Sequence, residues 1–493
     1  MSDLLARFAA RAEDDRTAIV DVHGAHSYRD VVAAAARIAA RLGPLKGERI
    51  AILVAPGARF VAAFFGVLFA RGTVVVLSPL HPAPETRYFC EDARVRGVLV
   101  SEEHEAHVDP LRDGFKVRSL EPLMDGAANI PSSFATADAP ALQLYTSGTT
   151  GKPKGAVLTH GNLSVQQKLL GEAWGFTEKD VLLHALPLHH MHGLCIALMT
   201  ALGAGACIEM TSFDAPKIWD AMERATSFMA VPAMYHRLFA AFDAADEAAR
   251  ARWAANAKNL RLATSGSAAL PVGLASRWKE LTGKIPLERF GMTEIGVGLS
   301  NVLDGERFPG CVGFPLPTVE TKIVDGELWI RGPSVFAGYH EKEEETKKAF
   351  SIDEGGTRWF KTGDTVTRVE ELAGAPFKIL GRTSVDILKS GGYKLSALEI
   401  EETLREHASV AEVAVIGVPD EAWGDRVVAC VVLRPGATCD AATLRSFVRE
   451  RLAPYKVPKD VLFLDELPKN ALGKVTKPDL VRSAQSKIHE KTS

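Results

Sequence analysis

Short apolar runs alternate with amphipathic segments along the first part of the chain. The apolar runs are rich in Val, Ile and Leu, have the length of buried strands, and lie at residues 49–54, 73–77, 97–101 and 141–147. The segments between them have helical spacing and lie at residues 31–42, 58–70 and 85–93. Ser27 and Asp30 form the capping pair expected ahead of the first helix. Strands that alternate with helices predict parallel sheets.

The rest of the chain continues this pattern and then changes it. Strands are expected at residues 181–186, 228–231 and 260–265, with a helix near residues 194–202. After about Gly310 the apolar runs become short and are typical of antiparallel strands, which we expect at residues 319–324, 327–331 and 377–381. The last segment predicts helices at residues 397–406 and 441–452 and strands at residues 413–418 and 426–433.

These elements predict an α/β fold with two domains. The larger domain, residues 1–381, should combine parallel-type α/β sheets with a small antiparallel β layer. The smaller domain, residues 382–493, should be α+β. We expect the boundary between Gly381 and Arg382, because the run KILGRTSVD around them has the composition of a turn.

Composition and charge exclude several classes of protein. With 47% hydrophobic and 24% charged residues, the chain is not disordered or collagen-like. A net charge of −3 offers no basic excess for binding nucleic acid. The six cysteines are scattered without a CxxC pair, which is typical of a reducing compartment. The longest apolar stretch, residues 60–70, is too short to span a bilayer, and no signal peptide is evident, so we expect a cytoplasmic protein without a membrane partner.

The strongest chemical signal is the run YTSGTTGKPKG at residues 145–155. It follows a predicted strand and holds three glycines, four hydroxyl side chains and two lysines. Glycine permits close backbone approach, so N–H, hydroxyl and ammonium groups can surround a polyphosphate. The spacing is not that of a P-loop, because only two residues separate Gly148 from Gly151 and Pro153 replaces the required Ser or Thr. On residue chemistry alone, a flexible surface turn remains the alternative.

This run resembles the signature of the adenylate-forming superfamily, which includes acyl-CoA synthetases, luciferases and the adenylation domains of peptide synthetases. Further signatures of that superfamily follow in order: FGMTE (290–294), KTGD (361–364), GR (381–382), KSGGYK (389–394) and PKN…GK (468–474). The resemblance spans residues 19–480. It implies that a carboxylate attacks the α-phosphorus of ATP, giving an acyl-adenylate and pyrophosphate, and that the thiol of CoA then displaces AMP. ATP, Mg²⁺ and coenzyme A are the implied ligands.

The resemblance also implies roles for individual residues. The implied ATP-binding residues are Thr146, Ser147, Gly148, Thr149, Thr150, Gly151, Lys152, Lys154, Gly266, Ser267, Ala268, Phe290, Gly291, Met292, Thr293, Asp364, Arg382 and Lys474. Glu294 and Thr146 are implied on the magnesium side of the site, and Asp364 would accept hydrogen bonds from the ribose hydroxyls. The catalytic set is Lys474, Glu294, Thr146 and Lys154.

The predicted C-terminal domain is implied to be a mobile lid. Lys474 would carry its ammonium to the α-phosphate during adenylation, and rotation of the lid would then present a second face for thioester formation. The implied CoA-binding residues on that face are Lys389, Ser390, Gly391, Gly392, Tyr393 and Lys394. The hinge is expected within residues 382–386.

Two arginines bear on the acid that is activated. Arg237 lies in VPAMYHR and Arg289 directly precedes FGMTE. A buried guanidinium without an anionic partner is costly, and a second carboxylate on the substrate would supply that partner. The surrounding stretches resemble those of synthetases that act on malonate, which implies that Arg237, Arg289 and Ser265 hold the distal carboxylate and that His190 shapes the acyl channel. Methylmalonate is a possible further substrate.

Several alternatives remain open at this point. Arg237 could cap its own helix or pair with a protein carboxylate. A synthetase for a short-chain or aromatic monocarboxylic acid is the alternative function. His189, His190 and His192 do not have a recognised metal-ligand spacing. A catalytically silent homologue is disfavoured because every catalytic position is filled. A peptide-synthetase module is disfavoured because no carrier domain follows the last motif, although a stand-alone adenylation enzyme is not excluded.

Overall fold

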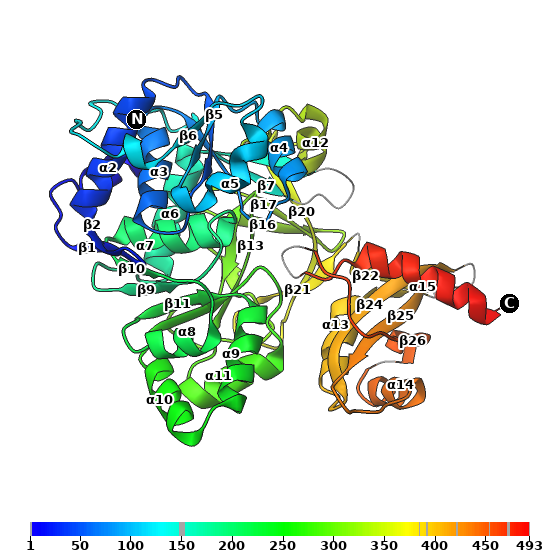
Figure 1. The fold of residues 1–493 in the computed structure, drawn as a ribbon. Coiled ribbons are helices and arrows are strands. Elements are labelled where there is room, and N and C mark those ends of the chain that lie inside the picture. Colours follow the sequence, from blue (N-terminus) through cyan, green and yellow to red (C-terminus); the bar gives the residue numbers. More distant parts are fainter. Residues whose placement is uncertain are drawn as a thin grey trace. The chain divides into compact units, whose positions relative to one another are not determined.

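The structure, a computed structural model, describes residues 2–146, 153–383, 385–390, 393–420, 423–452, 454–470 and 474–492. The chain forms two compact units (Figure 1). Unit 1 contains Met1–Thr321 and Ile330–Phe360, and unit 2 contains Lys322–Trp329 and Lys361–Ser493.

The first sheet of unit 1 has nine strands in the order β15-β14-β13-β12-β11-β9-β10-β1-β2. Its parallel strands are β1 (Thr17–Asp21), β9 (Val181–His184), β10 (Cys207–Met210), β11 (Ser227–Ala230), β12 (Leu262–Ser265) and β13 (Leu287–Met292). Antiparallel strands close both edges: β2 (Gly24–Ser27), β14 (Gly296–Ser300) and β15 (Phe314–Pro315). The expected parallel sheet is confirmed.

The second sheet of unit 1 has seven strands in the order β18-β8-β7-β4-β3-β5-β6. The parallel members are β3 (Arg49–Leu53), β4 (Thr73–Val76), β5 (Gly97–Val100), β6 (Val117–Ser119) and β7 (Pro140–Thr146). The antiparallel edge is formed by β8 (Lys154–Thr159) and β18 (Gly338–Tyr339). The central residues of β3, β4 and β5 are buried and apolar, as the sequence pattern predicts.

The α-helices of unit 1 are α1 (Asp3–Ala9), α2 (Tyr28–Leu42), α3 (Ala58–Phe69), α4 (Ala83–Asp92), α5 (Glu105–Val108), α6 (His160–Ala173), α7 (Met199–Ala204), α8 (Ala215–Ala221), α9 (Pro232–Ala244), α10 (Glu247–Lys258), α11 (Val272–Thr282) and α12 (Glu343–Ala349). Short 3₁₀ turns lie at Glu102–His104, Asp109–Leu111 and Glu121–Leu123. The predicted capping pair starts α2, because Ser27 and Asp30 exchange hydrogen bonds with each other's backbone N–H.

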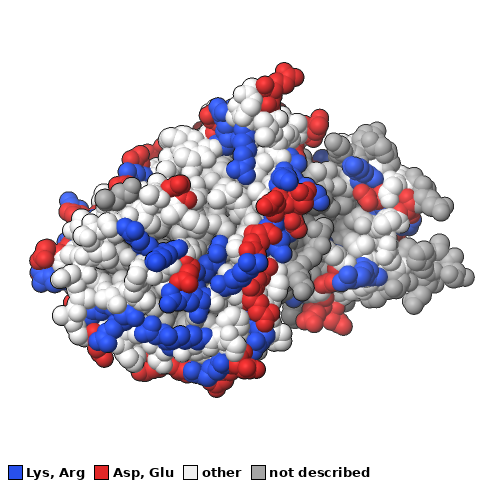
Figure 2. Space-filling view, turned by 90° about the horizontal axis from the view of Figure 1, so that it is seen from above, with Lys and Arg blue, Asp and Glu red and all other residues white. Residues whose placement is uncertain are grey.

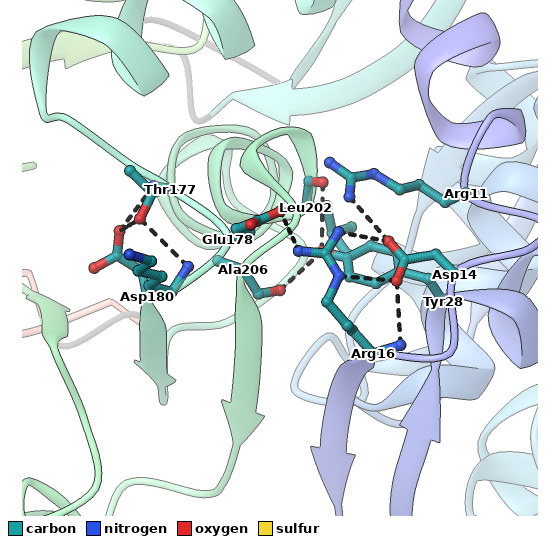
Figure 3. A network of polar contacts seen from close by, with 10 residues as sticks. Arg11, Asp14, Arg16, Tyr28, Thr177, Glu178, Asp180, Leu202 and Ala206 are labelled. Carbon is teal, nitrogen blue, oxygen red and sulfur yellow. Dashed lines mark hydrogen bonds and ion pairs between the residues drawn. The ribbon is translucent and has the colours of Figure 1, made fainter.

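A polar network fastens the amino-terminal segment to the first sheet (Figure 3). The Asp14 carboxylate accepts hydrogen bonds from Arg11 and Arg16, and Arg16 also pairs with Glu178 just before β9. The buried Tyr28 hydroxyl donates to the carbonyl of Ala206, 2.8 Å away, at the start of β10. These contacts join the beginning of the chain to strands that follow it by more than a hundred residues.

The small antiparallel layer is present as expected. Its five strands are β16 (Glu320–Val324), β17 (Glu327–Arg331), β19 (Phe350–Ile352), β20 (Arg358–Arg368) and β21 (Phe377–Arg382). β20 pairs antiparallel with both β19 and β21. The register of the second pairing places Asp364 opposite Arg382.

Unit 2 is built on a five-stranded sheet covered on both faces. The strands are β22 (Ile387–Ser390), β23 (Tyr393–Ser396), β24 (Val410–Asp420), β25 (Gly424–Leu433) and β26 (Asp460–Phe463), with helices α13 (Ala397–Arg405), α14 (Ala441–Arg449) and α15 (Lys477–Thr492) and a 3₁₀ turn at Pro454–Lys456. Alternate residues of β24 face different cores: Val413 and Val415 pack with α13 and α14, whereas Ala414 and Ile416 pack with α15.

The units divide earlier in the chain than the expected domain boundary. Contacts place Lys361–Gly381 with unit 2, because β20 and β21 form one hairpin. The hinge within residues 382–386 stays a prediction.

No helix in the described part of the chain combines the length and apolar character needed to cross a membrane. Acidic and basic side chains are interspersed over the face shown in Figure 2.

Candidate active site

Four sequence motifs lie where neighbouring strands of the first sheet end. β9, β11, β12 and β13 are consecutive parallel neighbours, and LPLHHMHG, VPAMYHR, SGSAALP and RFGMTE follow or end these strands in that order. Carboxyl ends of parallel strands lie at the same sheet edge, where open α/β sheets bind their ligands. The topology therefore explains why motifs more than a hundred residues apart form one site.

Arg289 is the buried charge of this site. It lies on β13, is 3% exposed, and packs against Gly266, where an added Cβ would lie 2.4 Å from the guanidinium carbon. Its Nε and Nη2 have no hydrogen-bond partner, and no described carboxylate lies within ion-pair distance of it. Burial lowers the pKa of Arg289 to about 9, so the guanidinium is still charged at neutral pH.

Histidines line the region beside Arg289. His192 is buried at the start of the π-helix η4 (His192–Leu198), and its Nδ1 lies 3.4 Å from the Ser267 hydroxyl. Burial, and then the charge of Arg289, holds the pKa of His192 well below its usual value, so this imidazole is neutral. Single π-helical turns are frequent at functional sites. Among the described residues, no three His, Cys, Asp or Glu side chains are arranged to hold a metal ion.

The other histidines of this motif are partly buried. The His189 and His190 rings are 4.1 Å apart, and His189 also lies edge-on to His81, 5.6 Å away. Burial, with the neighbouring His190 and His81, lowers the pKa of His189 to about 3. The His189 imidazole is therefore neutral at physiological pH. The channel role expected for His190 stays a prediction.

Ser265 and Arg237, which were both expected to bind the distal carboxylate, differ in their burial. Ser265 ends β12, is 1% exposed, and its hydroxyl has no partner among the described residues. Arg237 lies on α9 but is exposed, and its guanidinium stacks on the Phe213 ring at 4.5 Å. The expectation of a buried arginine is therefore confirmed for Arg289 and wrong for Arg237. Binding of the distal carboxylate by Arg237 stays a prediction.

The glycine- and lysine-rich run connects two antiparallel strands. Thr146 ends β7 and pairs with Lys154, which begins β8. Ser147, Gly148, Thr149, Thr150, Gly151 and Lys152 lie outside the described residues. The loop thus leads from strand to strand, whereas a P-loop leads from a strand into a helix. The phosphate-binding role expected for this run stays a prediction.

Glu294 is held in place by a tyrosine. Its carboxylate is 4% exposed and accepts a hydrogen bond of 2.9 Å from the Tyr339 hydroxyl. The Lys154 ammonium lies 5.5 Å from the centre of the Tyr339 ring, a cation–π distance. Tyr339 belongs to β18, which pairs with β8 and so brings this side chain between Lys154 and Glu294. The placement of Glu294 and Thr146 on the magnesium side of the site stays a prediction.

The implied adenine residues directly follow β12 or lie at the end of its parallel neighbour β13. Ser267 adopts a left-handed backbone (φ 69°), and both Ser267 and Ala268 are exposed. Phe290, Gly291, Met292 and Thr293 are partly buried. An added Cβ on Gly291 would lie 2.1 Å from the Gly296 carbonyl oxygen, so this position requires glycine for the close approach of two backbones.

In unit 2, β20 and β21 place a carboxylate next to a guanidinium. Asp364 is 6% exposed, and its Oδ1 lies 3.2 Å from Arg382 Nε. Arg382 also donates to the Thr362 carbonyl at 2.6 Å. The Thr362 hydroxyl in turn donates 2.7 Å to the Leu328 carbonyl, which fixes the KTGD turn. The resemblance-based partners for ribose and phosphate are therefore neighbours.

Lys474 lies in a short antiparallel turn closed by Asn470. The Asn470 amide N–H donates to the Lys474 carbonyl at 2.9 Å, and the Asn470 side chain accepts from Lys474 N–H at 3.0 Å. Desolvation, and then the positive charge of Arg382, lowers the pKa of Lys474. The positive charges of Lys474 and Arg382 thus repel each other within unit 2.

The implied CoA-facing residues form the β22–β23 hairpin. Ser390 is buried and pairs with Tyr393, and the Lys389 N–H donates to Asp425 at 2.7 Å. Gly391 and Gly392 lie outside the described residues, and Tyr393 and Lys394 are described by their backbone alone. The hairpin pairs Lys389 with Lys394.

Comparison with known proteins identifies the family. The AMP-binding enzyme family model matches residues 5–340, and the AMP-binding enzyme C-terminal domain model matches residues 399–474. The chain belongs to the AMP-binding enzyme family. The recognition of an adenylate-forming chain from its motifs is confirmed.

Relatives of this AMP-binding enzyme include malonate–CoA ligases and their solved structures. The mitochondrial malonate–CoA ligase ACSF3 of Bos taurus is 39% identical and aligns with 98% of this chain and 90% of its own length. The crystal structure of ATP-bound MatB from Rhodopseudomonas palustris has a TM-score of 0.89, 34% identity and 99% coverage of both chains. A malonyl-CoA ligase ternary product complex with methylmalonyl-CoA and AMP has a TM-score of 0.70, 34% identity, and coverage of 95% of this chain and 100% of that chain.

Tyr339 is the residue of this AMP-binding enzyme that sequence reasoning missed. It stands far from every quoted motif, and only the pairing of β18 with β8 brings it to Lys154 and Glu294. Gln143 of β7 was also missed; it accepts a hydrogen bond from Arg49 at 2.8 Å and packs against Gly155. Neither residue type carries a signal of its own in the sequence.

Proposed function

We propose that this protein is an ATP-dependent malonate:CoA ligase that forms malonyl-CoA, AMP and pyrophosphate through a malonyl-adenylate. The observation that carries the proposal is Arg289, a guanidinium that is 3% exposed and has two unpartnered nitrogens at the ligand edge of the sheet. A monocarboxylic acid would leave this charge unpaired after binding. The distal carboxylate of malonate supplies the missing acceptor.

Unit 1 supplies the groups that the first half-reaction requires. A carboxylate approaches a triphosphate, so the repulsion between two anions must be offset by local positive charge and donors. Lys154 and the hydroxyl of Thr146 flank the phosphate loop, and Lys154 is held over the Tyr339 ring. Glu294 and Thr146 would hold Mg²⁺ together with phosphate oxygens, and the bound ion neutralises charge that develops on the phosphates.

Unit 2 supplies the ribose contacts and the catalytic lysine. Asp364 accepts hydrogen bonds from the ribose hydroxyls, and Arg382 holds the nucleotide beside it. Lys474 stabilises the charge that builds on the α-phosphate as pyrophosphate leaves. In the second half-reaction, the β22–β23 hairpin guides the CoA thiol to the acyl carbon. The thiolate forms the new C–S bond as the C–O bond to AMP breaks.

Methylmalonate belongs to the proposed substrate range. Its two carboxylates have the same separation as those of malonate, so Arg289 meets the same partner. The related ternary complex that holds methylmalonyl-CoA supports this extension. The competing function, activation of a short-chain or aromatic monocarboxylic acid, is favoured only by the exposure of Arg237.

A substrate panel tests the proposal. The purified enzyme is given ATP, CoA and Mg²⁺ with acetate, propionate, malonate, methylmalonate or succinate, and release of AMP and the thioester product are both measured. We expect malonate and methylmalonate to support turnover far better than the monocarboxylic acids. Equal or better use of propionate would overturn the assignment, and AMP release without thioester formation would overturn the role of CoA.

A further inference from the structure

Unit 2 contains a buried lysine that the reaction scheme above does not use. Lys477, the first residue of α15, has a side chain that is 11% exposed. Its ammonium lies 2.5 Å from Asp386 Oδ1 and 2.7 Å from Glu401 Oε1. Both carboxylates are themselves enclosed, with side chains 14% and 4% exposed. A cation between two buried carboxylates makes a firm and directional link.

One end of this link holds the segment that carries Arg382. Asp386 Oδ2 accepts a hydrogen bond of 3.0 Å from the Arg382 N–H, and the Asp386 N–H donates 2.8 Å to the Arg382 carbonyl. Gly381 packs so tightly on Asp386 that an added Cβ would lie 2.4 Å from Asp386 Cβ. The position of Arg382, and with it the Arg382–Asp364 pair, therefore depends on where Asp386 lies.

The other end holds the turn that carries Lys474. Lys477 follows Lys474 by three residues, and the Thr476 N–H between them donates 2.9 Å to the Pro468 carbonyl across the turn. Glu401 is fixed independently, because its Oε1 also accepts 2.8 Å from the Val415 N–H of β24. The link therefore fixes the end of the Lys474 turn to both the core sheet and the Arg382 segment.

We propose that Lys477 is a positioning residue for adenylation. It holds the Lys474 turn against the Arg382 segment, so that the two charges meet the same nucleotide in a fixed relation. This inference rests on the proposed function, since it assigns Lys474 and Arg382 to one nucleotide. The effect requires a cation at residue 477 and no contact of that residue with substrate.

Separate assays of the two half-reactions test this role in the full-length enzyme. Adenylation is followed by malonate-dependent ATP–pyrophosphate exchange, and thioester formation is followed from preformed malonyl-adenylate and CoA. We expect Lys477→Met to slow adenylation at least ~10-fold, through kcat more than through the KM for ATP, and to leave thioester formation within ~3-fold. Lys477→Arg should restore most of the adenylation rate, because the cation is retained.

A matched control is available in Lys456, whose carboxylate partner Glu399 lies on α13, the helix that also carries Glu401. Lys456 pairs with Glu399 at 2.6 Å and is 21% exposed, but it has no contact with Asp386 or the Lys474 turn among the described contacts. Lys456→Met should leave both half-reactions within ~2-fold. A loss of adenylation in Lys456→Met equal to that in Lys477→Met would overturn the proposal, as would a parallel loss of both half-reactions in Lys477→Met.

A double-variant cycle separates positioning of Lys474 from a general structural effect. In a Lys474→Ala background, adding Lys477→Met should not lower the residual adenylation rate further, because Lys477 acts through the lysine already removed. An additional loss of the same factor would overturn the proposal. If Lys474→Ala leaves adenylation unchanged, the proposed function is contradicted. If Lys474→Ala impairs adenylation but Lys477→Met does not, only the positioning role of Lys477 is wrong.

Discussion

Two buried cations in this molecule have opposite surroundings. Arg289 in unit 1 is enclosed beside Gly266 and has no carboxylate partner among the described residues. Lys477 in unit 2 is enclosed between Asp386 and Glu401. A buried charge that is paired inside the protein serves the architecture, whereas one that is unpaired costs stability and is retained because a ligand completes it. The pairing state of a buried cation thus distinguishes a link within the fold from a binding site.

The largest expected effect on stability comes from the paired cation. Lys477→Met removes the cation from two enclosed carboxylates, of which Glu401 keeps its pair with Arg405 at 3.0 Å, and should lower the free energy of unfolding by about 3 kcal/mol. Chemical denaturation with unit-specific probes measures the loss. Lys456→Met, which breaks a more exposed pair, should cost only about 0–1 kcal/mol. A loss below about 1 kcal/mol in Lys477→Met would show that the link is not structural.

The unpaired cation should respond in the opposite direction. Arg289→Met removes an uncompensated buried charge with little change in side-chain length, and we expect it to raise the free energy of unfolding of the ligand-free protein by about 1–3 kcal/mol. The same denaturation experiment, without substrates, gives the value. Destabilisation by Arg289→Met would mean that the guanidinium already has a partner inside the protein.

The two cations should also differ in response to alkali. Burial alone would lower the pKa of Lys477, but the charges of Glu401 and Asp386 outweigh it and raise the pKa above its usual value. The stability from this link is therefore fully present below the ordinary lysine pKa of about 10.4 and is lost as pH rises through the raised pKa. Lys477→Arg should retain more stability than wild type above pH ~10.5, measured by denaturation at each pH. Parallel curves for both proteins would contradict this assignment.

The smallest effect is expected at the exposed arginine. Arg237 stacks on Phe213 at the surface, so Arg237→Ala should change the free energy of unfolding by less than about 1 kcal/mol. It should lower kcat/KM for malonate less than ~10-fold, well below the effect of changing Arg289. A loss for malonate as large as that in Arg289→Ala would restore the two-arginine pocket.

Much of the fold could be predicted from local pattern. The apolar runs became β3, β4, β5 and β7 almost residue for residue, because strands buried on both faces need continuous apolar sequence. β13, which contains the first residues of FGMTE, and β14, which follows the motif, escaped prediction because their glycine content hides the strand pattern. The glycine is there for the contact between Gly291 and Gly296, a tertiary requirement that one strand does not reveal.

For the candidate site too, the sequence predicts local features but not contacts between distant segments. The burial of Arg289 was expected from its place before FGMTE and is confirmed. The exposure of Arg237 could have been predicted, since Met234, Tyr235 and Leu238 mark the buried face of α9 and put residue 237 on the other side. Tyr339 and Lys477 could not, because their partners are set by strand pairing and by packing between distant segments.

The central claim, that Arg289 is reserved for the second carboxylate of the substrate, is tested most directly by comparing malonate with propionate. We expect Arg289→Ala to lower kcat/KM for malonate at least ~100-fold while propionate changes by less than ~3-fold, because only malonate loses a charged partner. Arg237→Ala is the control, because it removes the positive charge of the other arginine implied to bind the distal carboxylate. Equal losses of malonate and propionate activity in Arg289→Ala would contradict the account.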